Sequence, residues 1–449
     1  MDIIGLLPQA GGLIWIVVAF VVALSIIVTI HEYGHYIVGR WSGIHADVFS
    51  LGFGPVIYKR TDKRGTQWQI AALPFGGYVK FAGDANAASG KDTDAMQAVE
   101  ADAVALRRTM HGAPLWARAA TVAAGPVFNF VFSILLFAAL FLGSGTTRDQ
   151  LTVGELRALP TQVNELQPGD EILQIAGKPV PLISDDSFGP FLSSVPKTEQ
   201  LDYRVMRDGA ELDVQGPQIF PPLVVGLVPR SAAYQADLDV GDVIVGVNGT
   251  PISVFEQLKT NVEASDGAPV ALTVWRDGAI LDKTLSAKRV DEPQADGSYT
   301  TEWRIGIVGG MAFELATEPM GVWRALSDGV IETGGIITGS LSGLSHIITG
   351  AISTCNLSGP IGIAQTSGAM ASQGTQSFLR FIAVLSTAVG LLNLFPIPAL
   401  DGGHLVFYAY EAVMKRPPSD GALRILMGIG LTLVLTLMIF ALGNDIFCP

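Results

Sequence analysis

Four long apolar segments limit what this chain can fold into more than any other feature of its sequence. They run approximately over residues 13–38, 115–142, 378–394 and 425–442. A helix needs about 20 mostly apolar residues to cross the hydrocarbon core of a bilayer. Because lipid offers the backbone no hydrogen-bond partner, segments that cross it are helical or form closed barrels. The sequence therefore predicts a polytopic α-helical membrane protein with about four transmembrane helices.

Charge is scarce and unevenly distributed along the 449 residues. Asp, Glu, Lys and Arg make up 15% of the chain, and the formal net charge is −13, whereas about 25% charged residues is usual in soluble proteins. Most acidic residues lie between Asp149 and Glu302, which predicts a water-soluble part between the second and third spans. The chain has no basic stripe that could release phosphate counterions, so a nucleic-acid partner is excluded.

Basic residues near the spans predict the orientation of the chain. They occur after the first span and between the third and fourth spans, at Arg40, Lys59, Arg60, Lys63, Arg64, Arg107, Arg108, Lys415 and Arg416, whereas residues 1–13 and 443–449 have none. Short cytoplasmic loops are enriched in Lys and Arg. Both termini and the acidic soluble part are therefore expected outside the cytoplasm, which in a bacterium means the periplasm.

The acidic part contains an internal repeat. Residues 166–180 (LQPGDEILQIAGKPV) resemble residues 238–252 (LDVGDVIVGVNGTPI), and 205–213 resemble 274–282 in the same order. Alternating apolar residues and Asp-Gly or Asn-Gly turns are typical of short antiparallel strands. Two tandem β-rich domains are therefore predicted. The two cysteines, Cys355 and Cys448, are too few and too far apart in sequence to suggest a disulfide scaffold or a Cys-rich metal site.

The first span ends in the sequence His31-Glu32-Tyr33-Gly34-His35. Residues four apart share one face of a helix, so both imidazoles can reach one metal ion. Catalytic zinc usually has three protein ligands and one open position for water. Glu32 is placed to accept a proton from the water that the metal activates. Ionisable residues at membrane depth are costly and typically functional, so we predict a catalytic zinc site here.

A third ligand is expected from residues 393–404 (NLFPIPALDGGH), which lie at the same depth in the third span. Two prolines break this helix and free the backbone to turn Asp401 inward. Asp401 is the preferred ligand and His404 its competitor. Asn393, and Asn129 in the second span, are candidates for holding substrate or orienting ligands, although helix–helix hydrogen bonding is an equally good explanation.

The combination of these motifs resembles the site-2 protease family. It consists of H-E-x-x-H in the first span, G-P-x-x-N in the second and N-x-x-P-x-P-x-L-D-G in the third, with a repeated β module between them. The resemblance implies one Zn²⁺ held by His31, His35 and Asp401, with Glu32 as the catalytic residue. It also implies that Asn393 handles substrate.

The same resemblance implies a function and a location. Members of the family cut transmembrane segments of membrane-bound regulators, such as single-pass anti-sigma factors, after a first periplasmic cut. The active site would lie near the cytoplasmic side of the bacterial inner membrane, within the lipid bilayer.

Two further segments resemble known protein modules, one from bacterial periplasmic proteases and one from the site-2 protease family itself. The pattern L-x-x-G-D-x-I resembles PDZ domains of bacterial periplasmic proteases, which bind peptides or chain ends at a sheet edge; a plain spacer is the alternative. Residues 52–80 resemble a membrane-reentrant β-hairpin with its turn near 62–65. Its edge, either 67–73 or 78–81, is expected to pair with unwound substrate, with Gly76, Gly77 and Tyr78 as candidate contacts.

The expected parts follow one another along the chain. They are the first transmembrane helix with H-E-x-x-H (1–40), a cytoplasmic-side β-hairpin and mobile linker (41–114), the second transmembrane helix (115–145), PDZ-like domain 1 (146–218), PDZ-like domain 2 (219–292), an extension with an amphipathic segment (293–376), the third transmembrane helix (377–400), and a cytoplasmic connection with the fourth transmembrane helix (401–449).

Two other functions compete with proteolysis. A membrane metal transporter also places His and Asp within its spans, but it does not explain Glu32 or the peptide-binding modules. An inactive PDZ scaffold would not need the complete set of metal-binding residues.

Overall fold

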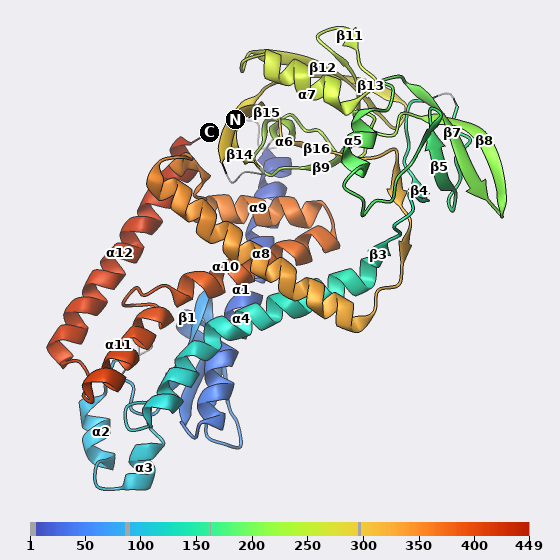
Figure 1. The fold of residues 1–449 in the computed structure, drawn as a ribbon. Helices are drawn as coiled ribbons and strands as arrows, with labels where there is room; N and C mark the ends of the chain where they lie inside the picture. Colours follow the sequence, from blue (N-terminus) through green and yellow to red (C-terminus); the bar gives the residue numbers. More distant parts are fainter. Residues whose placement is uncertain (1–5, 86–89, 162, 295–297, 449) are drawn as a thin grey trace. The chain divides into compact units, whose positions relative to one another are not determined.

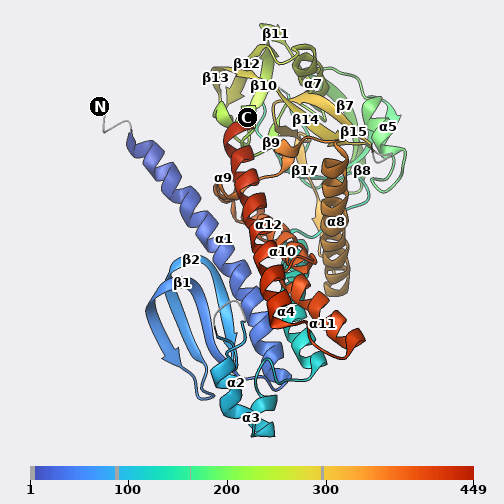
Figure 2. The same ribbon diagram turned by 90° about the vertical axis from the view of Figure 1, so that its left-hand side faces the viewer.

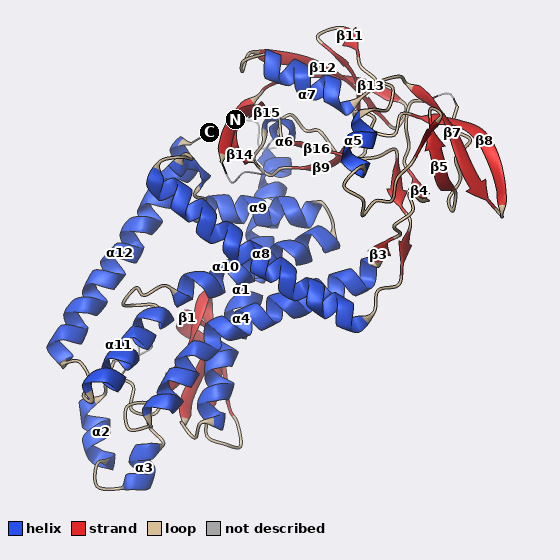
Figure 3. Ribbon diagram, in the orientation of Figure 1, coloured by secondary structure: helices blue, strands red, loops and turns tan. Residues whose placement is uncertain are grey.

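The computed structural model describes residues 6–85, 90–161, 163–294 and 298–448. Contacts divide the chain into two compact units. One unit is mainly helical and combines the segment up to Leu140 with the segment from Val322 onward; the other is rich in strands and comprises Phe141–Gly321. Figures 1 and 3 show the two kinds of structure along the chain.

All four predicted spans are helices: α1 (Leu6–Trp41), α4 (Leu115–Ser144), α10 (Thr375–Leu394) and α12 (Asp420–Phe447). Within the described residues, these are the helices long and apolar enough to cross a bilayer, with a mean hydropathy between 1.7 and 3.1. The prediction of four transmembrane helices is confirmed.

Small residues let three of these helices cross closely. A Cβ atom added to Gly34 of α1 would lie 2.6 Å from the carbonyl oxygen of Ala124 in α4. The hydroxyl of Ser133 in α4 donates a hydrogen bond to the carbonyl oxygen of Ala383 in α10 at 2.8 Å. Close backbone approach and interhelical hydrogen bonds replace the hydrophobic effect as the source of helix association in lipid. The motifs of the three spans are thereby brought together.

The segment after α1 forms an antiparallel hairpin of β1 (Ala46–Thr61) and β2 (Gln67–Phe81), drawn beside α1 in Figure 2. Both strands bend, with glycines of positive φ at Gly52 and Gly76. Residues 46–51 therefore lie between 67–70 on one side and 77–81 on the other, and 67–71 also pair with 56–61. Residues 67–70 thus form an inner strand, and in the described chain 77–81 form one edge of the sheet.

Part of the predicted linker is helical. It contains α2 (Thr93–Val99) and α3 (Ala103–Arg107), and residues 86–89 lie outside the described part. The side chains of Asp92 and Asp102 accept hydrogen bonds from the first turns of these helices. Such caps stabilise the start of a helix by about 1 kcal/mol. The two aspartates were the sequence signal for these helices, but the segment has too few apolar residues for the helical pattern to be recognised.

The duplicated blocks fold into two four-stranded sheets of the same relative order, β6-β5-β7-β8 and β11-β10-β12-β13. The bounds of their strands and of the helices beside them are β5 (Glu171–Ile175), β6 (Lys178–Pro179), α5 (Phe188–Ser193), β7 (Gln200–Arg207), β8 (Ala210–Pro217), α6 (Ala232–Gln235), β10 (Val243–Val247), β11 (Thr250–Pro251), α7 (Phe255–Ala264), β12 (Pro269–Arg276) and β13 (Ala279–Ser286). Each sheet has its own apolar core.

The repeated Gly-Asp motif has the same structural role in both sheets. Asp170 accepts hydrogen bonds from Arg207, and Asp242 accepts them from Arg276, at 2.6–2.7 Å. Both carboxylates are fully buried. A buried charge is tolerated when it is paired and hydrogen-bonded, so these motif residues maintain the fold.

The chain beyond the second sheet returns to the β-rich unit. Strands β16 (Ile307–Gly309), β17 (Phe313–Leu315) and β18 (Thr317–Glu318) pair with β9 (Val224–Leu227), β4 (Val153–Leu156) and β3 (Thr146–Thr147), and β14 (Lys288–Pro293) pairs with β15 (Tyr299–Arg304). The predicted extension 293–376 is therefore divided: its strands belong to the β-rich unit, and α8 (Val322–Thr349) and α9 (Pro360–Ser372) belong to the helical unit.

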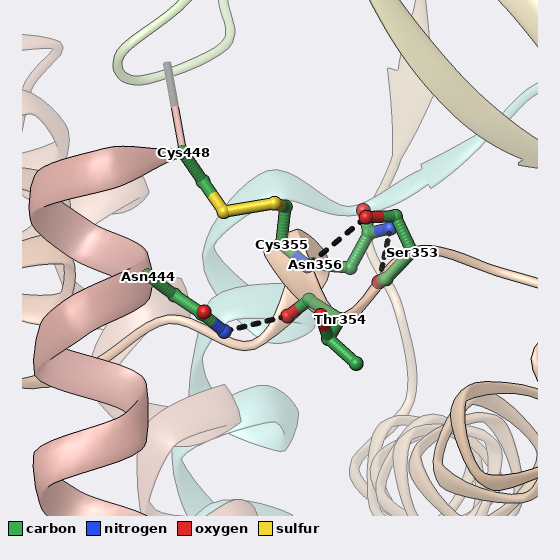
Figure 4. Close-up of a disulfide and its surroundings, with 6 residues drawn as sticks. All are labelled: Ser353, Thr354, Cys355, Asn356, Asn444 and Cys448. Carbon is green, nitrogen blue, oxygen red and sulfur yellow. Dashed lines mark hydrogen bonds between the residues drawn. A yellow bond between two sulfur atoms is a disulfide. The ribbon is translucent and has the colours of Figure 1, made fainter.

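A disulfide joins Cys355, in the 3₁₀ helix Thr354–Asn356, to Cys448 directly after α12 (Figure 4). The amide of Asn444 donates a hydrogen bond to the carbonyl oxygen of Thr354 at 2.7 Å. Asp445 accepts hydrogen bonds from the main-chain N–H groups of Gly359 and Gly362 at 3.0 and 2.9 Å. The sequence analysis did not predict this bond, because its partners are 93 residues apart and only the fold brings them together.

Candidate metal centre

The two histidines of H-E-x-x-H lie on one face of α1. Their Nε2 atoms are 3.1 Å apart, and the two rings meet edge to face. The chain between α10 and α11 (Asp401–Met414) contains the predicted break and begins the new helix at Asp401. Its carboxylate Oδ2 lies 3.1 Å from Nε2 of His31 and 3.5 Å from Nε2 of His35. The structure thus gathers all three predicted ligands.

The outer nitrogens of both imidazoles contact α4. Nδ1 of His35 lies 2.9 Å from the carbonyl oxygen of Thr121. A carbonyl oxygen can only accept, so this Nδ1 carries the proton, and the Nε2 of a neutral ring has a free lone pair. The amide of Asn129 lies 3.3 Å from Nδ1 of His31. Its fully buried Oδ1 has no partner, and a half-turn of the amide places that oxygen against a His31 Nδ1–H.

These contacts make the inner atoms a site for a cation. With both Nδ1 atoms protonated, two Nε2 lone pairs and a carboxylate oxygen converge, and Oδ2 of Asp401 accepts no hydrogen bond. Without a positive charge among them such electron-rich atoms repel one another. A tetrahedral zinc ion with bonds of about 2.0–2.1 Å requires ligand atoms roughly 3.3 Å apart, and the observed separations are 3.1–3.5 Å. The group fits zinc.

A cavity of about 520 Å³ opens beside this group. Glu32, Tyr78, Asn393 and His404 line it together with the three ligands. Gly77, Tyr78 and Val79, in the edge segment of the hairpin, line the same cavity as Glu32, and a Cβ atom added to Gly77 would lie 3.2 Å from Cγ of Glu32. The Glu32 carboxylate, the three candidate metal ligands and the unpaired strand edge therefore border the same cavity.

The other predicted site residues are distributed around this cavity. Gly77 also lines it, whereas Gly76 packs against the ring of Phe53. Asn129 is fully buried and is not among the lining residues. His404 is outside the metal group, and burial lowers its pKa below the usual value despite the opposing charge of Asp401.

Sequence reasoning missed two contributors from α4. Thr121 acts through its main-chain carbonyl, for which a side chain gives no signal. Gly125 lies against the imidazoles: an added Cβ would be 2.3 Å from Nε2 of His35. Its place in the G-P-x-x-N motif was the available signal.

Comparison with known proteins agrees with this geometry. The profile of Peptidase family M50 matches residues 19–437. Two proteins named "Putative zinc metalloprotease", from Agrobacterium fabrum and Rhizobium meliloti, are each 35% identical to this chain. The first match covers 98% of both chains and the second covers 95% of both. Regulator of sigma-E protease RseP from Salmonella typhimurium is 33% identical over 97% of this chain and 99% of its own.

The matches cover the helical and the β-rich units alike. The transporter and scaffold alternatives are set aside, because the relatives are named zinc metalloproteases and the match extends over nearly the whole chain. The spans and these relatives make the chain an integral inner-membrane protein with β-rich domains. This chain belongs to peptidase family M50, the site-2 protease family of zinc metalloproteases.

Proposed function

We propose that this chain is an intramembrane endopeptidase in which His31, His35 and Asp401 hold one zinc ion and Glu32 is the general base. The observation that carries the proposal is the convergence of three lone-pair donors beside a glutamate, in a cavity between apolar helices. A zinc ion held there supplies a Lewis acid that polarises water and the scissile carbonyl.

The residues of the chain do the remaining work. Glu32 takes a proton from the attacking water and passes it to the leaving amine. Asn129 and the Thr121 carbonyl keep the imidazoles oriented with Nε2 facing inward, as groups behind metal-binding histidines commonly do. The position of Asn129 favours this orienting role over substrate binding. Asn393, which lines the cavity, contacts the substrate backbone.

The edge segment 77–81 holds the substrate. A helix must unwind before its carbonyls can be attacked, and an unwound chain can add to a free strand edge. This edge reaches the cavity through Gly77, Tyr78 and Val79. Within 67–73, the other predicted edge, residues 67–70 are paired on both sides. The hairpin enters the membrane, with exposed Ile57 and Leu73 meeting lipid.

The substrates are single-pass membrane regulators of the anti-sigma-factor type, cut after a first periplasmic cleavage. One relative is named for the regulation of sigma-E. The β-rich unit lies in the periplasm as two PDZ-like domains that exclude substrates with bulky outer domains. The disulfide at the end of α12 supports this orientation, because disulfides persist in oxidising compartments such as the periplasm.

The catalytic assignment is tested with two variants of the purified protein and a membrane-spanning reporter. Glu32→Gln should retain zinc and lose cleavage, whereas His35→Ala should lose both. Cleavage by Glu32→Gln at the wild-type rate, or full zinc occupancy in His35→Ala, would overturn the assignment.

The strand-edge role is tested with proline, which removes a main-chain donor. Tyr78→Pro should abolish cleavage, and Tyr78→Ala reports the loss of the side chain alone. Ile57→Pro, on the opposite edge of the same sheet, is the matched control and should cleave normally. Equal activity of Tyr78→Pro and Tyr78→Ala would contradict the proposal.

The filter is tested by removing residues 149–315. The paired strands β3 and β18 flank this segment, so a short linker can close the gap. The deletion should permit cleavage of an untrimmed substrate. Strict dependence on prior trimming in this variant would argue against a filter.

A further inference from the structure

Helix α11 carries Asp401 at its first residue, and its Leu405 and Tyr408 pack against the apolar cluster that includes Ala117 and Val122 of α4. Of its 14 residues, only Gly402 and Gly403 are buried, and both lie next to the broken segment that precedes the helix. Asp401 reaches histidines that lie more than 360 residues earlier in the chain. The position of α11 therefore decides whether the carboxylate meets the imidazoles.

One ion pair fixes the body of α11 to α4. The guanidinium of Arg118 donates two hydrogen bonds to Glu411, from Nη1 to Oε2 at 3.0 Å and from Nη2 to Oε1 at 2.6 Å. Arg118 also donates from Nε to the carbonyl oxygen of Ala113 at 3.1 Å and lies over the ring of Tyr408. Among the described residues, no side chain of α11 other than Asp401 and Glu411 forms a hydrogen bond or ion pair with another element.

This pair is more than an ordinary surface contact. The side chains of Arg118 and Glu411 are only 15% and 18% exposed. A bidentate arginine–carboxylate pair fixes direction as well as distance. Breaking one side of a partly buried pair leaves the other charge uncompensated, so the pair favours the observed position of α11 against α4.

The residues of α4 that contact the metal group or the helix carrying Asp401 lie on one face. Arg118, Thr121, Gly125 and Asn129 are three or four residues apart, the spacing of one helix face. Thr121 and Asn129 hold the two imidazoles, and Gly125 lies against both rings. Arg118 holds the helix that carries the carboxylate. One face of α4 thus supports both halves of the site.

We propose that Arg118 and Glu411 are positioning residues of the metal centre. Their ion pair holds α11 against α4 in the position in which Asp401 completes the ligand set. The proposal rests on the ligand role of Asp401 proposed above. Neither residue touches the metal group. Loss of groups that orient ligands typically costs roughly 10–100-fold in metal affinity, and that is the effect expected here.

The test measures zinc affinity of the full-length purified protein by competition with a chelator. Glu411→Gln keeps the shape of the side chain and removes its charge, and it should bind zinc roughly 10–100-fold more weakly. The exchanged pair Arg118→Glu with Glu411→Arg should recover most of the affinity. The matched control is Glu332→Gln, which breaks the Arg380–Glu332 pair (2.7 Å) between α8 and α10 and should leave zinc affinity unchanged.

Thermal unfolding of each variant separates positioning from folding. Weaker zinc binding by Glu411→Gln in a protein that melts normally supports the proposal, as does recovery of zinc binding in the exchanged pair if the single variant is unstable. Unchanged affinity in Glu411→Gln overturns it, and so does an exchanged pair that regains its melting temperature without regaining zinc.

Asp401→Asn is measured alongside. If Asp401→Asn binds zinc like the wild type, the proposed ligand set itself fails. If Asp401→Asn loses zinc while Glu411→Gln does not, only the positioning role fails.

Discussion

The Nδ1 nitrogen of His35 and the carbonyl oxygen of Thr121, 86 residues apart, are joined by a 2.9 Å hydrogen bond between α1 and α4. The bond fixes both the tautomer and the rotation of the ring, so Nε2 faces Asp401 before any metal arrives. Residues that are already oriented do not lose that freedom on binding, which favours affinity. The helix pair α1–α4 is therefore as much part of the metal centre as the ligands.

The contact of Gly125 with the imidazoles predicts that Gly125→Ala will prevent zinc binding. The added methyl group would lie 2.3 Å from Nε2 of His35 and 2.8 Å from Cε1 of His31, distances that force both rings to move. Zinc content of the purified protein should fall to a small fraction of the wild-type value. Gly143→Ala in the same helix meets no atom within 4 Å and serves as the control. Full occupancy in Gly125→Ala would show that the rings are not held where they lie.

The burial of Asn129 against His31 predicts different results for two substitutions. Asn129→Asp keeps an oxygen acceptor for Nδ1–H and should bind zinc at least as tightly as wild type. Asn129→Leu removes the acceptor and should weaken zinc binding by roughly 10–100-fold. At saturating zinc, Asn129→Leu should recover an unchanged KM for the reporter. A raised KM under those conditions would instead support the predicted contact with substrate.

The spans and the metal group could be predicted because their signals are local. Uninterrupted apolar residues mark a helix in lipid, and the four-residue spacing of His31 and His35 places both on one face. Asp401 was identifiable because two prolines must break the third span just before it. These inferences depend on short stretches of chain and elementary geometry.

Features that depend on contacts between distant segments could not be predicted. The role of Thr121 lies in a backbone carbonyl, which every residue has. The bond between Cys355 and Cys448 requires the end of α12 to reach the segment before α9. Which hairpin segment forms the free edge depends on the bends at Gly52 and Gly76, which insert residues 46–51 between 67–70 and 77–81.

The buried carboxylate of Asp84 predicts a pH dependence of stability. It accepts a hydrogen bond from the main-chain N–H of Phe81, at the end of the edge segment, and lies 3.1 Å from Nε2 of His111. Burial raises the pKa of Asp84, although His111 opposes the shift. A raised pKa in the folded state stabilises the fold below the unfolded pKa of about 3.9 and loses that contribution as pH rises through the folded value.

Asp84→Asn has no such titration. The melting temperature of the wild type relative to Asp84→Asn should therefore fall as the pH rises from about 4 toward neutrality. The comparison uses thermal unfolding of both proteins in the same detergent. A difference that does not change with pH would mean that the carboxylate is not titrating in this environment.

The disulfide predicts a restraint on the C-terminal end of α12, a helix whose N-terminal half lines the cavity beside the metal group through Met427 and Leu431. Replacing Cys355 and Cys448 by serine removes a cross-link that closes a loop of 93 residues, which by chain entropy is worth up to roughly 4–5 kcal/mol. The melting temperature of the double variant should fall clearly below that of the wild type. The matched control, Asn444→Ala, removes only the neighbouring hydrogen bond to Thr354 and should have a smaller effect.

The same bond gives a direct assay of its compartment. In intact spheroplasts, a membrane-impermeant maleimide should label the two cysteines only after treatment with a reductant, because a disulfide has no free thiol and the proposed orientation exposes it to the periplasm. Labelling without reductant would contradict the bond. Labelling that requires both reductant and disruption of the membrane would place the end of α12 in the cytoplasm and reverse the proposed orientation.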